Sequence, residues 1–170
     1  MSEMELGTEI ALRVGCYGIG AWLLGLAKEF AIESQDLMPV PVVDSKIALV
    51  SSMGLRLTLH HPHAGHVDDG DLDRWVLTDA EFGFAGQLGG NWSLPAPFGI
   101  EPATCTPSIV SAALGDVLSG VTPNDLSATS LEQTYFLKDD RAVGMTWRST
   151  LIGIESMHVV RLGIPMEYEN

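Results

Sequence analysis

The chain has 170 residues, which suits one domain that buries roughly 70% of its unfolded surface, and it is short for two independent domains. Its 22 acidic and 9 basic side chains give a formal net charge of −13, which argues against nucleic acid and anionic membranes as partners. Apolar residues make up 46% of the chain and exclude general disorder, so the charge favours a soluble domain with a cationic partner or ligand.

The N-terminal segment predicts a helix that glycines interrupt. Thr8 is a candidate N-cap for a helix that starts near Glu9, and apolar residues then recur at three- and four-residue spacing, most strongly over Ala21–Glu33. Gly15, Gly18 and Gly20 weaken the first half of this pattern, so we expect a break or close helix packing near Gly18.

An uncharged run of 14 residues lies within this segment, at Val14–Ala27. It is shorter than the ~20 residues that a membrane span needs, and acidic residues precede it, unlike the basic start of a secretory signal. We interpret it as a buried helix.

The next part of the chain predicts strands. Residues 36–43 carry two prolines and indicate an extended linker. Strands are expected at 46–51 and 55–60 around a turn at 52–54, and a loop covers 61–70. A further strand starts at Trp75 and continues toward Phe84, where glycines mark a bend.

The second half begins with a clear helix signal. Thr106 is an N-cap candidate, Pro107 follows at the first helical position, and Gly115 ends the helix as a left-handed cap. The expected apolar face holds Ile109, Val110, Ala113 and Leu114. Residues 117–130 indicate a polar loop, and strands are expected at 134–137, 142–149, 151–155 and 157–162, with a tight turn at 138–141.

Runs of strands with short turns predict an antiparallel arrangement, hence a single α+β domain over residues 1–170 with two main helices. The order of elements also suggests two halves, 8–90 and 94–165, each built from a helix and three strands.

The two cysteines, Cys16 and Cys105, have no metal-binding or redox spacing and indicate a reducing compartment, although a single bridge between them stays open. Cys105 precedes a predicted helix N-terminus, which would lower the pKa of its thiol; a buried structural role is the favoured alternative.

Four histidines, His60, His61, His63 and His66, lie within seven residues and are followed by aspartates. Imidazole and carboxylate groups suit a transition metal, so a metal-binding enzyme or sensor is one hypothesis. The favoured interpretation is a solvated turn between strands without a bound metal.

An acidic surface is the stronger candidate for a binding site. The segment from Val67 to Phe82 has six acidic residues and one arginine, with a tryptophan among them. Acids around an exposed ring suit a tight binder of a basic protein, and the alternative is a solvated face with the ring in the core. The candidate partner-binding residues are Asp68, Asp69, Asp71, Asp73, Trp75, Asp79 and Glu81.

The remaining carboxylates and hydroxyls give no catalytic pattern. Glu132, Asp139, Asp140 and Glu155 are interpreted as surface charge, and the sequence has neither a nucleophile elbow nor a phosphate loop.

From Leu94 onward the chain resembles immunity proteins of bacterial polymorphic toxin systems. The resemblance follows Pro97-Phe98-Gly99-Ile100, the helix from Thr106 to Gly115, the strand at 135–137, the turn at 139–141 and the strands at 143–147 and 159–162. The first part is also similar to a small lipoprotein of the outer-membrane barrel assembly machinery, but the lipid-attachment cysteine of that family is not in place here. The long insert between Gly115 and Tyr135 departs from both patterns.

The resemblance implies a cytoplasmic inhibitor that neutralises a cognate toxin by tight non-covalent binding, with no catalytic residues and no cofactor. The acidic composition agrees with this, because an acidic inhibitor can cover the basic cleft of a toxin that acts on nucleic acid. The other hypotheses are the metal-binding enzyme or sensor and an accessory protein of the cell envelope.

Overall fold

The computed structural model describes residues 6–29, 40–42, 46–51, 53–61, 72–122, 131–162 and 166–167. The helices are α1 (Leu6–Arg13), α2 (Gly20–Glu29) and α3 (Pro107–Leu114), with short 3₁₀ helices η2 (Leu72–Arg74), η3 (Pro97–Gly99) and η4 (Gly115–Val117). The strands are β1 (Cys16–Tyr17), β2 (Val40–Val42), β3 (Lys46–Ser51), β4 (Leu55–His60), β5 (Val76–Gly83), β6 (Leu118–Val121), β7 (Glu132–Leu137), β8 (Arg141–Trp147), β9 (Ile154–Arg161) and β10 (Met166–Glu167). In these parts of the chain, no helix has the length and apolar character needed to cross a membrane.

The main sheet is antiparallel and has the strand order β2-β3-β4-β5-β9-β8-β7-β6, so the predicted α+β fold is confirmed. The order is symmetric about the central pair, because each half of the chain supplies four consecutive strands and its last strand lies in the middle. Each half therefore contributes four strands to the sheet, one more than the sequence predicts. A separate parallel pair joins β1 to β10.

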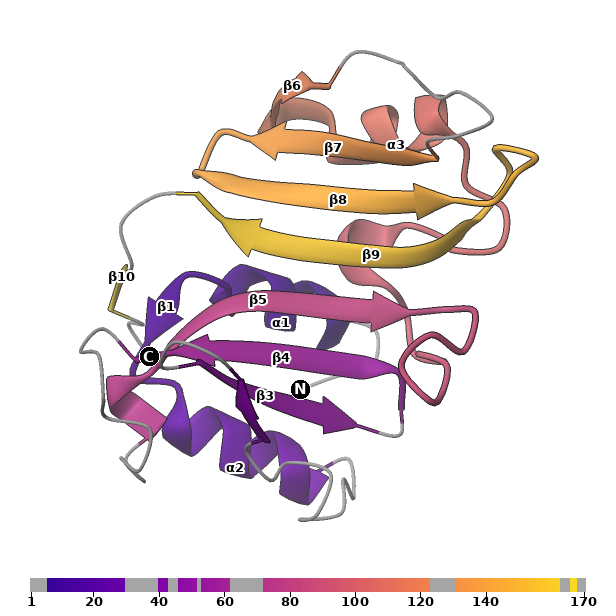
Figure 1. Ribbon diagram of the computed structural model, residues 1–170. Coiled ribbons are helices and arrows are strands. Elements are labelled where there is room, and N and C mark those ends of the chain that lie inside the picture. Colours follow the sequence, from indigo (N-terminus) through magenta and orange to yellow (C-terminus); the bar gives the residue numbers. More distant parts are fainter. Residues whose placement is uncertain are drawn as a thin grey trace.

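One face of the sheet carries the core. Side chains alternate between buried and half-buried along β4, β7, β8 and β9, and the buried set faces the helices. The largest fully buried side chains are Trp75, Trp147, Tyr135 and Phe82. In Figure 1, α1 lies behind β5 and α3 lies behind β7. Helix α2 lies beyond the β3 edge, and no helix lies in front of β4, β5, β9, β8 or β7. The opposite face is therefore the open face of the sheet.

The predicted break in the first helix is confirmed, because α1 and α2 are separated by a turn and β1. Gly15 has a φ of +91° and Gly18 a φ of +77°, a backbone region that favours glycine. The expected N-cap role of Thr8 is wrong: this residue lies inside α1, and its hydroxyl accepts a hydrogen bond from the Phe98 N–H at 2.9 Å. The side chain thus joins α1 to the connection between the two halves.

The second helix signal is confirmed. The Thr106 hydroxyl accepts a hydrogen bond from the Ile109 N–H, and Pro107 opens α3. Gly115 has a positive φ of 44°, but its ψ of −120° lies outside the left-handed helical region. Of the expected apolar face, Val110 and Leu114 are buried, whereas Ile109 is 51% exposed.

Two segments expected to be irregular form edge strands. Residues 40–42 of the expected linker pair with β3, and Pro41 is compatible with this place because an edge strand leaves one side of its backbone unpaired. Residues 118–121 of the expected polar loop pair with β7, where Leu118 lies opposite Leu137. The prolines at 39 and 41 concealed the first strand, and the polar residues that follow Val121 concealed the second.

The strand expected at 151–155 is wrong. Leu151 and Gly153 have φ values of +58° and +84°, which a strand does not tolerate, and β9 starts at Ile154. The Gly153 N–H donates to the Cys105 carbonyl at 2.8 Å, so this turn packs on the segment before α3. Residues 154–161 form one continuous strand instead of the two expected.

A buried arginine joins the second half to α1. Arg141 opens β8 and is 8% exposed; its Nε donates to the Val14 carbonyl at 3.2 Å. Its terminal nitrogens bond to the Leu12 carbonyl and the Asp139 carboxylate. The last carbonyls of a helix have no partner within the helix, and a cation is favourable there, so Arg141 serves as a C-cap from a distant strand.

Replacement of this arginine tests that role. We expect Arg141→Met to lower the free energy of unfolding by about 3 kcal/mol, because two buried carbonyls lose their charged donors. Denaturant unfolding measures the change, and Arg148→Met, at an exposed arginine, is the matched control with an effect within about 0.5 kcal/mol. A loss for Arg141→Met as small as that of the control would show that water replaces the guanidinium.

Candidate functional site

The open face of the sheet carries a row of polar side chains across its centre. Register places Arg56 of β4 opposite Glu81 of β5, and Glu81 opposite His158 of β9. His158 in turn lies opposite Gly144 of β8, and Gly144 opposite Thr134 of β7. The row therefore crosses five adjacent strands and joins side chains from both halves of the chain.

A histidine–carboxylate pair lies at the centre of this row. The His158 Nε2 contacts the Asp79 Oδ2, a diagonal neighbour on β5. This hydrogen bond raises the pKa of His158, and the negative charges of Asp79 and Glu81 act in the same direction. Burial and the positive charge of Arg56 lower the same pKa and offset part of the rise.

A hollow of about 270 Å³ lies over Gly144. A Cβ atom built on this glycine would come no closer than 3.8 Å to the side chain of His158, so the missing side chain leaves open space between β9 and β7. The lining comes from four strands and is mainly polar: Glu81, Glu132, Gln133, Thr134, Gly144, Met145, Thr146, Ser156 and His158.

The chemistry of the hollow is that of a hydrogen-bond acceptor site. Two carboxylates, Glu81 and Glu132, accept hydrogen bonds from a cation, and the hydroxyls of Thr146 and Ser156 add further acceptors. Ser156 and His158 share no hydrogen bond, so the arrangement lacks the nucleophile–base contact of a hydrolase triad. The carboxylates and hydroxyls of the hollow can therefore accept hydrogen bonds from a cationic group.

The structure separates the sequence-predicted acidic residues. Asp79 and Glu81 lie on the open face, whereas Asp68, Asp69 and Asp71 lie outside the described residues.

Asp73 and Trp75 have structural contacts instead. The Asp73 carboxylate accepts a hydrogen bond from the Gly20 N–H at 2.6 Å, at the start of α2, and its carbonyl accepts the Gly18 N–H. Trp75 is fully buried and packs edge-on against His61, so the expectation of an exposed tryptophan anchor is wrong. Trp75 lies between η2 and β5, and its ring belongs to the core.

The first two histidines of the cluster belong to the end of β4 and the residue after it. His60 is half-buried at the end of β4, and His61 is 3% exposed against Trp75, while His63 and His66 lie outside the described residues. Among the residues that the structure describes, no three metal-ligating side chains come together.

Both cysteines are buried free thiols, so the bridge that the sequence left open does not form in this structure. Burial raises the pKa of the Cys105 thiol, and the nearby charge of Glu101 adds to the rise. The alternative of a thiol activated by the helix N-terminus is therefore wrong, and Cys105 is a core residue.

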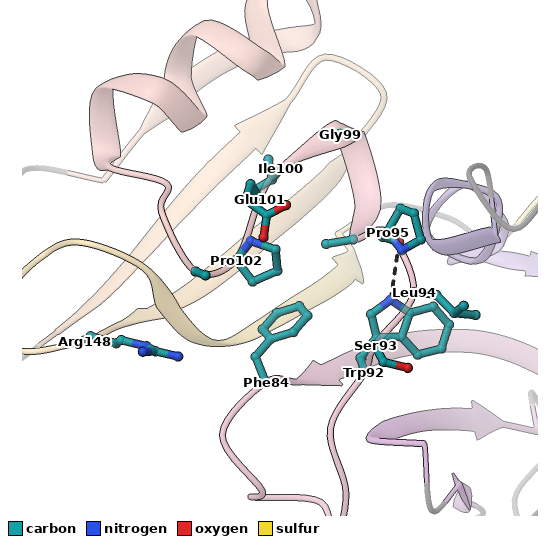
Figure 2. Close-up of a pocket in the computed structure, with 12 residues that line it drawn as sticks. Phe84, Trp92, Ser93, Leu94, Pro95, Gly99, Ile100, Glu101, Pro102 and Arg148 are labelled. Carbon is teal, nitrogen blue, oxygen red and sulfur yellow. Dashed lines mark hydrogen bonds between the residues drawn. The ribbon is translucent and has the colours of Figure 1, made fainter.

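A second concavity lies on the connection between the halves (Figure 2). Its volume is about 530 Å³, and we call it the aromatic cleft. Its lining comes from the segment after β5 and from the turn between β8 and β9: Phe84, Trp92, Ser93, Leu94, Pro95, Ala96, Gly99, Ile100, Glu101, Pro102, Ala103 and Arg148.

Sequence reasoning missed His158, Gly144 and the hollow. The available signal was the alternation of Ser156, His158 and Val160, which places all three on one face once residues 154–161 form a single strand. This strand pairs with β5, and Asp79 of β5 is 79 residues before His158 in the sequence. A pairing over that distance has no local sequence signal.

Comparisons with protein-family models, with curated proteins and with solved structures found no match. The functional argument therefore depends on the geometry of the chain itself.

The histidine–carboxylate pair predicts a pH dependence of stability. Because the pKa of folded His158 lies above its unfolded value of about 6.5, the pair stabilises the fold fully below that value. This contribution is lost as the pH rises through the folded pKa.

An NMR titration measures that folded pKa, and Asp79→Asn is expected to lower it toward the ordinary value and to flatten the stability profile. Asp116→Asn, at an exposed acid of η4, is the control. An unchanged titration of His158 in Asp79→Asn would contradict the contact.

Proposed function

We propose that the protein is a stoichiometric inhibitor of the immunity class, which binds a basic partner on the open face of its sheet. The observation that carries the proposal is the polar, carboxylate-bearing face at the centre of the sheet, with the hollow over Gly144. Helices cover the other face, so this is the broad regular surface that the sheet leaves for a partner.

Charge supports a basic partner. The chain has a net charge of −13, and its field attracts a cationic protein and accelerates encounter. Asp79, Glu81 and Glu132 place carboxylates on the open face, where they are within reach of the partner.

The shape of the face supports a specific contact. The hollow has the size for one long side chain, and its acceptors suit the ammonium of a lysine or the guanidinium of an arginine. A side chain held in a partly desolvated pocket at the centre of an interface is where binding free energy concentrates.

The immunity assignment combines this geometry with the resemblance over residues 94–162. As proposed, the inhibitor acts in the cytoplasm on a cognate toxin whose functional surface is basic. The binding site is now proposed at Asp79, Glu81, Glu132 and the hollow instead of at the acidic loop.

Two variants test the proposed face. We expect Glu81→Lys with Glu132→Lys to slow association with the partner and to weaken the salt dependence of the rate. We expect Gly144→Val to fill the hollow and to speed dissociation by about tenfold or more. Asp116→Lys in η4 and Gly120→Val in β6 are matched controls, because Gly120 also has open space around its Cβ position.

The partner is captured from source-cell lysate with a C-terminal tag other than polyhistidine, purified, and measured by surface plasmon resonance at two salt concentrations. Co-expression in a bacterial host then tests protection: the partner alone should stop growth, and the wild-type chain should restore it. A partner that binds both face variants and both controls equally well would overturn the site. A captured partner that is harmless when expressed alone would overturn the immunity assignment.

A further inference from the structure

The aromatic cleft shares no lining residue with the hollow over Gly144. Phe84 and the largely buried Trp92 line the cleft, and Pro95 and Pro102, farther along the same segment, complete the wall (Figure 2). A volume of about 530 Å³ falls within the range of roughly 300–1,000 Å³ that is usual for ligand pockets.

The walls of the cleft are fixed before any ligand arrives. The Trp92 N–H donates to the Gly83 carbonyl at 2.8 Å, and its indole Nε1 donates to the Pro95 carbonyl at 3.3 Å. The ring also packs edge-on against Phe82, at 5.1 Å between centroids. A preformed wall reduces the entropy that binding costs.

Glycines secure the same segment against its neighbours. A Cβ atom on Gly54 would lie 2.6 Å from the Trp92 nitrogen, and a Cβ atom on Gly7 would lie 2.6 Å from the Pro95 carbonyl oxygen. The segment after β5 therefore packs closely against α1 and against the turn before β4, and the cleft is part of the packed structure.

Two opposite charges line this otherwise apolar cleft. Glu101 and Arg148 are both exposed, and neither forms an ion pair with another described residue. In Figure 2, Glu101 lies on the Pro102 side of the Phe84 ring, and the Arg148 side chain approaches that ring from the left.

We propose that the aromatic cleft binds a free α-amino acid with an aromatic side chain. The ring of the ligand packs on Phe84 and Trp92, its ammonium bonds to Glu101, and its carboxylate bonds to Arg148. A zwitterion satisfies both charges at once, whereas a simple anion or cation leaves one of them without a partner. This proposal does not depend on the immunity assignment.

Three related probes test the charges separately. L-phenylalanine carries both ligand charges, phenethylamine lacks the carboxylate, and 3-phenylpropanoate lacks the ammonium. By isothermal titration calorimetry we expect saturable equimolar binding of phenylalanine, and affinities about tenfold weaker for each of the other two. Tryptophan fluorescence follows the same titrations, and Trp92→Phe should remove most of the change.

Variants assign each charge to its partner. In Arg148→Gln, phenylalanine should bind no better than phenethylamine, and in Glu101→Gln it should bind no better than 3-phenylpropanoate. Arg74→Gln and Asp116→Asn, at exposed residues outside the cleft, are the controls and should bind phenylalanine as the wild type does. No saturable heat with phenylalanine, equal affinity for all three probes, or wild-type behaviour of Arg148→Gln and Glu101→Gln would each overturn the proposal.

Discussion

The pairing of β5 with β9 is the contact on which the rest of the structure depends. Each half of the chain folds its own strands into a meander, and each meander ends on one of these two strands. Left apart, β5 and β9 would each expose an unpaired edge. Their register also aligns Phe82 with Met157 toward the helices and Glu81 with His158 toward the open face. A shift by one residue would exchange the two faces, so a single register fixes both the core and the polar row.

The central pairing also determines where the cleft lies. Because β5 and β9 are neighbours, the segment after β5 must cross the end of β9 before α3 can cover the second half. Along this segment, the Phe84 N–H donates a hydrogen bond to the Glu155 carbonyl of β9. The turn at Gly153 packs on the segment before α3. The aromatic cleft therefore lies between two connections that the sheet topology brings together.

The sequence predicts those features whose causes are local. Thr106 and Pro107 open α3 as expected, and the glycine-rich break in the first helix is where the pattern places it. The contacts that sequence reasoning missed join distant segments: Asp79 to His158, Arg141 to the carbonyl of Leu12, and Asp73 to the start of α2. Asp73 and Trp75 illustrate the limit of sequence reasoning. Acidic residues around an aromatic ring have the same sequence pattern whether they form a binding surface or, as here, cap a helix and fill the core.

Charge on the open face is distributed unevenly between the halves. On the β5 side, Asp79 contacts His158, which is a cation when protonated, and Arg56 lies opposite Glu81, so each acid has a basic neighbour. On the β7 side, Glu132 lies opposite Thr146, and no described cation pairs with it. Among the described residues of the face, Glu132 is thus an acid without a basic partner, and it lines the hollow over Gly144. Since His158 loses its charge as the pH rises, Asp79 is then left uncompensated and the acidic region extends from β7 across the centre of the sheet.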